Sequence, residues 1–399
     1  MTRDTQDGST RRRFLKAGTG LAVSGALAGC GQDGAGSTAT GDGGDPTSSA
    51  RDESTTGEGT DAATESASGE SYAVSMEPVG TVELDGVPES WVPFTGDYAD
   101  MGVALGQADG LEAIGVPERF GTHYYEELPD VSVDKESLTT LYQEGTGKEI
   151  FYEIGADVHV VDPNFMSNRL QWSRSDVEEV RRNVAPFFGN TIFTRVYDWH
   201  DYQHYSLYEA FEKVAQLFRQ QERYDAFANL NEEVTASIRE NLPDESLDVA
   251  LLYPASIPPE SFYPYLIGEG TASKQWRTLN VGDALAKNGI ADAQAGGGTI
   301  DFETLLDIDP DAIAVRIQGN ITEEYFRENV VRPLQQHDVA SQLTAVQNDR
   351  VVYGGLTYQG PIIYLFQLEM AAQGLYPEAF GDEPLFDRRR VNDIVTGDF

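Results

Sequence analysis

Cysteine and histidine are scarce in this chain of 399 residues, and their scarcity excludes several kinds of site. Cys30 is the only cysteine, so the chain cannot form an internal disulfide. Of the five histidines, only His200 and His204 have a spacing that places two imidazoles on one face of a helix. Zinc would need further ligands beside this pair. We therefore predict no resident metal site, and direct ligation of a bound iron by a histidine or tyrosine stays an open alternative.

Catalytic motifs are missing as well. The chain has neither the G-x-S-x-G pattern of a nucleophile elbow nor the H-E-x-x-H pattern of a zinc protease. Residues 145–148 (GTGK) match only part of a phosphate-binding loop, because Tyr142 stands where the first glycine belongs and Glu149 follows the lysine. We therefore predict that the protein is not an enzyme and holds no cofactor.

Basic residues are few, and only six of them are lysine. With 28 basic and 66 acidic side chains, the formal net charge is −38. Such a surface repels phosphate backbones, so we predict no binding to nucleic acid. Strong screening at high salt removes the self-repulsion of an acidic surface, which favours a halophilic protein. An acidic surface that binds cations is the alternative.

Long apolar runs are absent after residue 30, so no membrane span is predicted there. Before it, a segment with twin arginines (11–16) precedes the apolar run 17–28 and the sequence Leu-Ala-Gly-Cys at 27–30. This order is typical of an export signal and resembles a lipoprotein processing box. Residues 1–30 are therefore predicted to be a twin-arginine lipoprotein signal, with a lipid on Cys30 that anchors the protein to the outer face of the cell membrane. A buried helix with a packed thiol is the alternative.

Residues 31–75 contain mainly Gly, Ser, Thr, Ala and acidic residues. Such a segment buries too little apolar surface to offset the entropy of ordering, so it is predicted to be a disordered tether. As a flexible chain it would reach roughly 35–40 Å.

The remaining residues suggest two lobes, 76–220 and 246–399, with a connecting helix over 221–242. Alternating strands and helices in both parts indicate parallel sheets covered on both faces. The predicted strands are 91–94, 111–114, 157–161 and 191–194 in the first lobe, and 248–253, 312–317 and 350–353 in the second. The fold class is therefore α/β, with two Rossmann-like sandwich lobes.

Apolar residues recur at three- and four-residue spacing through Tyr224, Phe227, Val234 and Ile238, which predicts one long amphipathic helix. Pro243 marks its end. At 1.5 Å per residue such a helix is about 30 Å long, enough to run from one lobe to the other.

Five segments resemble a known family: 92–120, 148–161, 302–315, 345–355 and 375–380. They are similar to the solute-binding lipoproteins of ABC importers for ferric siderophores, haem and cobalamin. The resemblance implies a periplasmic-binding-protein fold, with two lobes joined by one long helix and the ligand held between them. It also implies an extracytoplasmic monomer that delivers its ligand to permease membrane subunits.

Two glutamates stand at matching places in the two lobes. Glu149 lies eight positions before Asp157, and Glu303 lies eight positions before Asp311. The resemblance implies that both glutamates pair with arginines of the permease, a contact that sets orientation and association rate. The alternative is that both are first-turn glutamates favoured by the helix dipole. Gly155 and Ala156 depart from the family's usual Lys-Pro before the aspartate.

Ligands of open α/β sheets bind beyond the carboxyl ends of the strands, so the loops after the strands are the predicted ligand site. Aromatic residues and arginines gather there, and arginine can grip carboxylate or catecholate oxygens through paired hydrogen bonds. This suits a ferric-siderophore-type iron chelate; haem, cobalamin and a sensor without transport function are the alternatives. The predicted ligand-binding residues are Tyr98, His123, Tyr124, Arg169, Arg195, Tyr197, Trp199, Tyr253, Tyr263, Arg316 and Tyr358.

Overall fold

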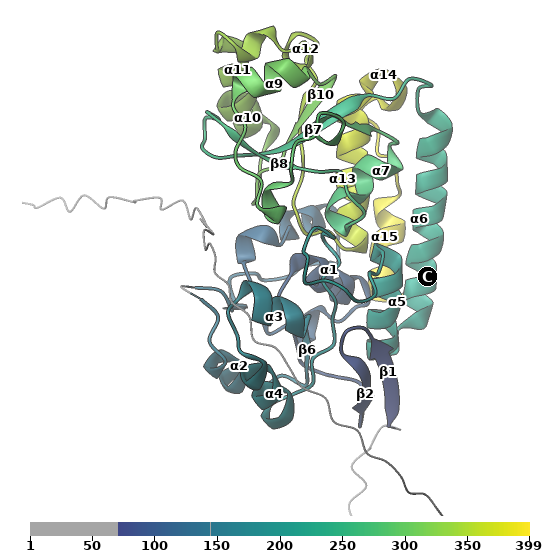
Figure 1. The fold of residues 1–399 in the computed structure, drawn as a ribbon. Coiled ribbons are helices and arrows are strands. Elements are labelled where there is room, and N and C mark those ends of the chain that lie inside the picture. The colour runs from purple at the N-terminus through teal and green to yellow at the C-terminus, as the bar shows by residue number, and fades with distance from the viewer. Residues whose placement is uncertain (1–70, 144) are drawn as a thin grey trace, which may run out of the picture. The chain divides into compact units, whose positions relative to one another are not determined.

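The computed structural model describes residues 71–143 and 145–399, shown in colour in Figure 1. The predicted export signal, Cys30 and most of the predicted tether lie outside the described residues. The tether was expected to reach residue 75, but Tyr72–Met76 forms strand β1, paired antiparallel with β2 (Gly80–Leu84). Val74 and Met76 are buried while their neighbours are exposed, so an alternating pattern lets this hairpin cover α5 (Leu207–Phe218).

The first lobe contains short parallel strands. Strand β3 (Trp91–Pro93) pairs with β6 (Val158–Val160), and β4 (Ala113–Ile114) pairs with β5 (Thr139–Thr140). Single bridges add Leu111 beside Trp91 and Phe187 beside His159. These strands bring the ends of β3, β4 and β6 to one edge of the lobe.

The predicted strand over 191–194 is wrong. Its carbonyls accept hydrogen bonds from the other lobe instead, from Thr271 N to Ile192 O at 2.9 Å and from Ala272 N to Phe193 O at 3.3 Å. Gly270 permits this approach, because a Cβ on it would lie 2.1 Å from the Phe193 carbonyl oxygen. The segment therefore fastens the two lobes together.

Helices and 3-10 turns cover the first lobe. The helices are α1 (Gly96–Ala104), α2 (Glu149–Ile154), α3 (Pro163–Arg169), α4 (Arg174–Asn183) and α5. The 3-10 turns are η1 (Ala108–Gly110), η2 (Pro117–Arg119) and η3 (Thr122–Glu127).

The second lobe has a sheet in the order β11–β10–β7–β8, with β9 also on β7. The strands are β7 (Asp248–Pro254), β8 (Phe262–Tyr265), β9 (Gly282–Asp283), β10 (Ala312–Val315) and β11 (Val351–Tyr353). The expectation of a purely parallel sheet is wrong, because β8 runs antiparallel to β7. A turn closed by Ala255 N and Ser261 O reverses the chain there, as no helix intervenes between these two strands.

Short helices surround this sheet: α7 (Lys274–Thr278), α8 (Ala284–Lys287), α9 (Phe302–Ile308), α10 (Glu323–Phe326), α11 (Arg332–Gln336) and α12 (Thr344–Gln347). A π-helical stretch (Arg327–Val331) joins α10 to α11, and the 3-10 turns are η4 (Thr271–Ser273), η5 (Ala293–Ala295) and η7 (Ala340–Gln342). The chain ends with α13 (Pro361–Leu375), α14 (Pro377–Phe380) and α15 (Arg388–Thr396).

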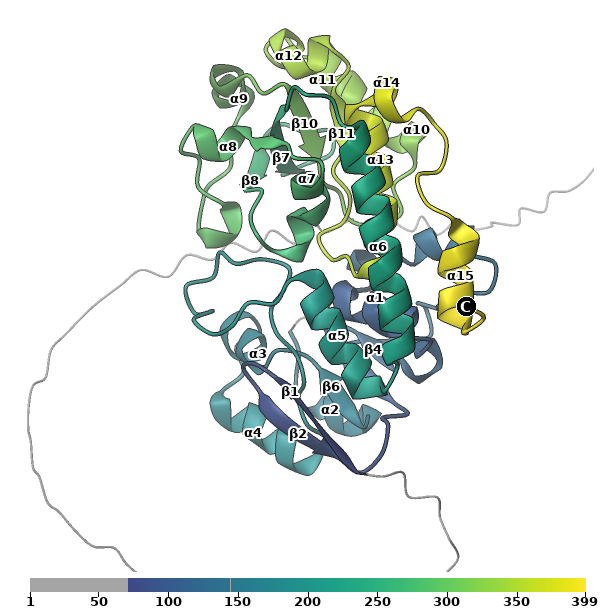
Figure 2. The ribbon, with the colours of Figure 1, turned by 90° about the vertical axis from the view of Figure 1, so that its right-hand side faces the viewer.

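The connecting helix is α6 (Gln221–Asn241), and Figure 2 shows it running alongside both lobes. Phe227, Leu230, Val234 and Ile238 form its buried stripe. Its 21 residues span about 32 Å. The predicted α/β class, with two lobes and one long connecting helix, is confirmed.

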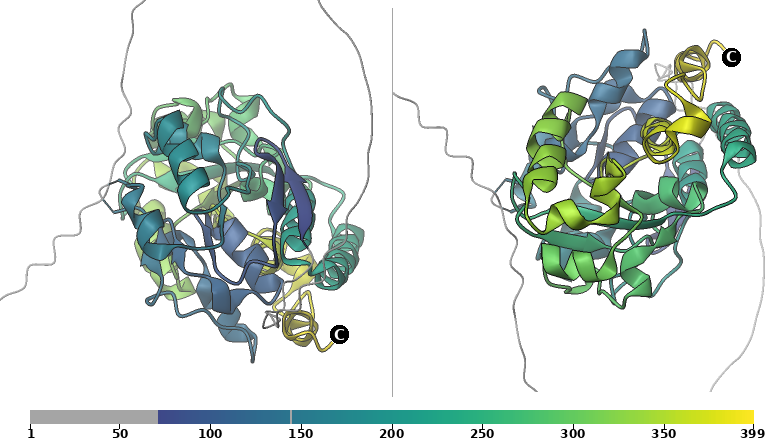
Figure 3. Two further views of the ribbon diagram at one scale, coloured as in Figure 1. Left: turned by 90° about the horizontal axis from the view of Figure 1, so that it is seen from below. Right: turned by 90° about the horizontal axis from the view of Figure 1, so that it is seen from above.

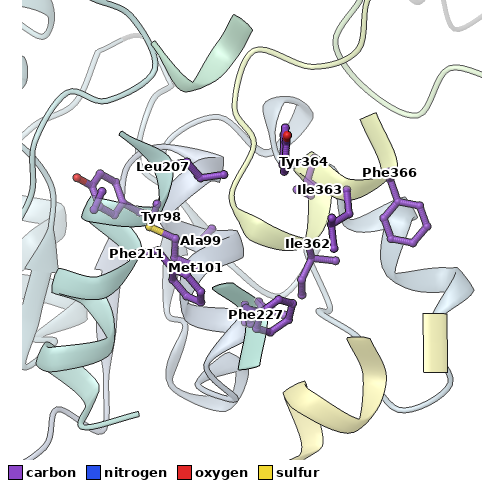
Figure 4. Packing of buried hydrophobic residues seen from close by; sticks show 14 of the residues in the cluster. Tyr98, Ala99, Met101, Leu207, Phe211, Phe227, Ile362, Ile363, Tyr364 and Phe366 are labelled. Carbon is purple, nitrogen blue, oxygen red and sulfur yellow. The ribbon is translucent and has the colours of Figure 1, made fainter. Parts of the chain in front are cut away.

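One apolar core continues through both lobes. Figure 4 shows it where α1, α5, α6 and α13 meet, with Tyr98, Ala99, Met101, Leu207, Phe211, Phe227, Ile362, Ile363, Tyr364 and Phe366 labelled. Asp100 of α1 reinforces the junction by accepting hydrogen bonds from the backbone N of Ile362 and Ile363, both at 3.0 Å, at the start of α13.

The last helix does not belong to the second lobe, although the sequence assigns 246–399 to it. Helix α15 packs against α6 and α1. In Figure 3 it is the yellow helix at the end marked C. Its apolar residues Val391 and Ile394 are buried there. An amphipathic pattern predicts a buried face but does not say which lobe covers it.

Candidate functional site

Side chains from the facing edges of the two lobes meet in one place, at or near the carboxyl ends of β4, β6, β10 and β11. We call this group the inter-lobe cluster, and it consists of Arg119, Arg169, Tyr197, Tyr265, Arg316 and Tyr358.

Arg169 and Tyr197 form the first-lobe wall of the cluster. Arg169 is the last residue of α3, whose start is fixed by Asp162, which accepts a hydrogen bond from the Asn164 backbone N. The Arg169 guanidinium carbon lies 5.1 Å from the centroid of the Tyr197 ring, a cation–π distance. Tyr197 also stacks on Trp199, with ring centroids 5.0 Å apart. A tryptophan therefore reports directly on this wall.

Arg119 and Tyr358 form a second pair in the cluster, in which Arg119 is exposed and Tyr358 is buried. The Arg119 side chain donates a hydrogen bond to Tyr358, and its guanidinium carbon lies 6.0 Å from the Tyr358 ring centroid. Tyr358 raises the pKa of Arg119. Gly96 lets the two segments meet, because a Cβ there would lie 2.9 Å from the Arg119 carbonyl oxygen and 3.3 Å from the Tyr358 Cβ.

Arg316 is the second-lobe member and is 1% exposed. Its Nη2 donates to the Ala272 carbonyl at 2.7 Å, and its guanidinium carbon lies 5.6 Å from the Tyr265 ring centroid. Its Nε has no hydrogen-bond partner, and burial lowers its pKa. A buried cation with an unused donor is costly unless an anion approaches it.

Asp292 of the second lobe is a carboxylate close enough to the cluster for its charge to act on Tyr197 and Arg316. Its oxygens already accept hydrogen bonds from the backbone N of Leu266 at 2.8 Å and of Gln294 at 2.7 Å. Burial raises the pKa of Tyr197 and Tyr358, so both phenols stay neutral donors. Three arginines and neutral phenols together favour an anionic ligand.

Several predicted residues lie outside the cluster. The Tyr98 ring is buried on α1, and its hydroxyl bonds the backbone of Asn190 at 2.9 Å. Tyr124 is buried and stacks on Phe366, with His123 against it. Tyr98 lies on α1 after β3, and His123 and Tyr124 lie on η3 after β4. Tyr98 and Tyr124 are on the buried faces of these elements and so belong to the core.

Arg195 also lies elsewhere, since it is exposed and its charge acts on Arg277, Glu209, His200 and His204. On the hairpin of the second lobe, Tyr253 and Tyr263 lie opposite each other. Both are half-buried, and Tyr253 is within electrostatic reach of the cluster, since it raises the pKa of Arg119.

Sequence reasoning missed Arg119 and Tyr265 as binding residues. Arg119 ends a 3-10 turn after β4, at the same edge as the predicted loops, so the strand rule could have found it. Tyr265 lies on the antiparallel strand β8, two residues after the predicted Tyr263, so the segment was selected but the wrong tyrosine of it was chosen.

The two predicted docking glutamates occupy matching places. Glu149 is exposed in the first turn of α2, which leads into β6, and Glu303 is exposed in the first turn of α9, which leads into β10. The two helices lie in different lobes, as Figure 1 shows. Both carboxylates are available to a partner molecule.

Two searches of the described residues concern metals and membranes. Within residues 71–143 and 145–399, no group of three or more His, Cys, Asp or Glu could hold a metal ion. The His200 and His204 rings lie 3.7 Å apart without a third ligand of this kind. Over the same residues, every helix is too short or too polar to cross a bilayer.

Comparisons with known proteins concern the family and the fold. The family model described as periplasmic binding protein matches residues 141–356, which is more than half of the chain. Among curated proteins, no sequence matches.

Solved structures share the fold at low sequence identity. A periplasmic binding protein from Veillonella parvula has a TM-score of 0.56 at 13% identity, covering 77% of this chain and 99% of its own. The petrobactin-binding protein YclQ from Bacillus subtilis has 0.55 at 14%, covering 77% and 99%. The iron uptake ABC transporter substrate-binding protein PiuA from Streptococcus pneumoniae has 0.54 at 16%, covering 77% and 100%.

Proposed function

The chain belongs to the periplasmic binding protein family, and from this we propose that it captures a ferric-siderophore-type iron chelate between its lobes for an ABC importer. The family consists of substrate-binding proteins of such importers rather than enzymes, and it works outside the cytoplasm. The nature of the ligand and the residues that hold it are the proposed steps.

The observation that carries the proposal is the inter-lobe cluster. Arg119, Arg169 and Arg316 converge on one place in a chain whose net charge is −38. Guanidinium groups bind carboxylate and catecholate oxygens through paired hydrogen bonds, and aromatic rings pack against flat organic ligands. A bulky anionic chelate satisfies both features. Two of the structural neighbours are named for petrobactin binding and iron uptake, which favours iron chelates over other anions.

Tryptophan fluorescence tests the ligand. The purified chain would be titrated at fixed high salt with a ferric catecholate, a ferric hydroxamate, haem and cobalamin. We expect saturable quenching by a ferric siderophore, because Trp199 stacks on Tyr197 in the cluster. Trp199→Phe should remove most of the signal without removing binding. Saturation by haem or cobalamin alone would contradict the proposal.

Binding variants locate the site. Arg119→Gln and Tyr358→Phe should each weaken chelate binding about tenfold or more, since each removes part of a charge-assisted pair. Arg182→Gln, on the exposed surface of α4, removes the same charge elsewhere and serves as the control. Equal affinities for all three variants would show that the chelate does not occupy the inter-lobe cluster.

We further propose that Glu149 and Glu303 dock the loaded protein onto the permease. They lie in equivalent first turns of α2 and α9, one on each lobe, and each is exposed. Charges at a docking rim mainly set orientation and association rate. The double variant Glu149→Ala/Glu303→Ala should therefore lose most uptake while binding the chelate normally.

The chain offers a matched control for docking. Glu153 and Asp307 lie four residues after the two glutamates and are also exposed. Glu153→Ala/Asp307→Ala removes the same charge from the same helices and should leave uptake nearly normal. If both double variants transport equally well, docking does not use Glu149 and Glu303.

Attachment to the membrane is proposed to use a lipid on Cys30, with the acidic segment after it as a tether. The protein would act as a monomer at the outer face of the membrane, in a high-salt environment that suits its charge. Cys30→Ser should release the protein into the medium while leaving chelate binding intact. A variant that stays in the membrane fraction would contradict lipid anchoring.

A further inference from the structure

A second groove lies away from the inter-lobe cluster, beside the connecting helix. It has a volume of about 350 Å³ and lies between α5, α6 and α7. Figure 2 shows these three helices on one side of the molecule. The lining residues used below are Tyr208, Tyr224, Glu232, Arg239, Lys274 and Arg277.

The groove is rich in cations for so acidic a chain. Lys274, Arg277 and Arg239 line it, and Glu232 is the acid among its lining residues. Arg195 lies close enough for its charge to lower the pKa of Arg277, after the larger effect of burial. Like charges repel, so the mutual repulsion of Lys274, Arg277 and Arg239 is relieved when an anion binds between them.

Aromatic rings position Lys274, and backbone carbonyls position Arg277. The Lys274 Nζ lies 4.3 Å from the Tyr364 ring centroid and 5.9 Å from that of Tyr208. In residues 71–143 and 145–399, Lys274 forms no ion pair within 4.0 Å. Arg277 donates to the Gly270 carbonyl at 2.9 Å, and Glu269 approaches its Nε only to 4.0 Å. Pre-positioned cations lose little entropy when an anion binds.

We propose that this groove binds a small polycarboxylate anion. Its volume lies in the range of small-molecule sites, roughly 300–1,000 Å³. Cations come from two separate helices, α6 and α7, so an anion with several carboxylates reaches both of them. Tyr208 and Tyr224 add phenol groups that can donate hydrogen bonds to the same ligand.

Such an anion fastens the second lobe to the connecting helix. Lys274 and Arg277 belong to α7, which directly follows η4. In this turn, Thr271 N donates a hydrogen bond to the Ile192 carbonyl. The Ala272 carbonyl accepts a hydrogen bond from Arg316 of the inter-lobe cluster. Residues 270–277 therefore carry contacts of both the groove and the inter-lobe cluster on one short stretch of backbone.

Titration calorimetry with citrate tests the proposal on the full chain at a fixed chloride concentration, because salt screens the contacts. We expect saturable binding of one citrate per chain. Lys274→Gln and Arg239→Gln should each weaken it about tenfold, as loss of one charge-assisted contact predicts. Arg182→Gln should change it less than about twofold, since an exposed charge on α4 contributes little. Hydrogen exchange in α7 should slow when citrate is present.

Three results would overturn the proposal. One is the absence of saturable heat, and another is citrate binding that Lys274→Gln and Arg239→Gln leave unchanged. The third is loss of citrate binding in Arg119→Gln, which would place the anion in the inter-lobe cluster instead. Sulfate that binds as tightly as citrate would overturn the polycarboxylate class, because one oxyanion cannot span both helices.

Discussion

The two lobes repeat one structural frame with different side chains. In the first lobe, Asp157 accepts hydrogen bonds from the backbone N of Glu89 and Ser90, both at 2.9 Å, just before β3. In the second lobe, Asp311 accepts one from the backbone N of Asp248 at 2.8 Å, at the start of β7. Asp157 therefore joins the start of β6 to the residues before β3, and Asp311 joins the start of β10 to the start of β7.

The helix cap and the buried strand residue are less favourable for stability in the first lobe. Helix α2 begins at Lys148 without a side-chain cap, whereas α9 is capped by Asp301, which accepts from the Thr304 backbone N. At matched positions of β6 and β10 stand His159 and Ile313, both fully buried. The two lobes therefore share the spacing of helix and strand but differ in the helix cap and in the side chain buried on the strand.

The largest expected effect comes from the apolar residue two positions after each of Glu149 and Glu303. Phe151 and Leu305 are both 0% exposed. Phe151→Ala should lower the free energy of unfolding by about 3–5 kcal/mol and Leu305→Ala by about 2–5 kcal/mol, because each leaves a cavity. Denaturant titration of both variants measures the difference. Losses below about 1 kcal/mol would show that these positions are not equivalent core anchors.

A pH experiment tests the effect of burying His159 where the second lobe buries Ile313. Both imidazole nitrogens lack partners, and burial lowers the pKa of His159 from 6.5 to about 4. Between these values the unfolded state binds a proton that the folded state does not, so stability falls as pH falls through this window. His159→Ile, which copies Ile313 of the other lobe, should remove about 2–3 kcal/mol of that loss.

The control for this prediction is internal. Burial raises the pKa of Asp97 to about 6 and of Asp100 to about 7, so these carboxyls titrate in the same window with the opposite sign. They are present in both proteins, and their effect cancels in the difference between the two unfolding curves. Parallel curves for wild type and His159→Ile from pH 7 to pH 4 would refute the assignment.

The smallest expected effect concerns the helix cap. Asp301→Ala should lower the free energy of unfolding by about 1 kcal/mol, because the first turn of α9 loses its acceptor. Asp307→Ala on the same helix is the matched control, and it should change stability by less than about 0.5 kcal/mol. Thermal unfolding of the two variants side by side measures this. A control that costs as much as the cap variant would contradict capping as the cause.

The sequence predicts best what depends on local pattern. Strands β7 and β10 are continuous apolar runs, and α6 has a clear three- and four-residue spacing, so both kinds of element were predicted near their observed bounds. Residues 191–194 have the composition of a strand, but their carbonyls bond Thr271 and Ala272 of the other lobe. Such a pairing depends on how the lobes meet, which no local pattern contains.

The candidate site was predicted in part for the same reason. Arg169, Arg316 and Tyr358 follow parallel strands and do meet between the lobes, whereas Tyr197 meets them although the predicted strand before it does not form. Tyr98 and Tyr124 follow strands too, but the helix or turn that carries each one directs it into the core. That ligands bind beyond the carboxyl ends of strands identifies the right loops. Which side chains of a loop face the gap between the lobes depends on how the following helix or turn is rotated about its axis.

The return of α15 to the first lobe has a consequence for how the chain folds. Arg390 of this helix bonds Glu233 of α6, and its apolar face closes the core beside α1. The first lobe is synthesised early, yet the helix that completes it is synthesised only after the second lobe. Until then the nascent lobe exposes apolar surface, a state that favours aggregation. A chain cut just before α15 would therefore have a less stable first lobe, although that lobe lies far from α15 in the sequence.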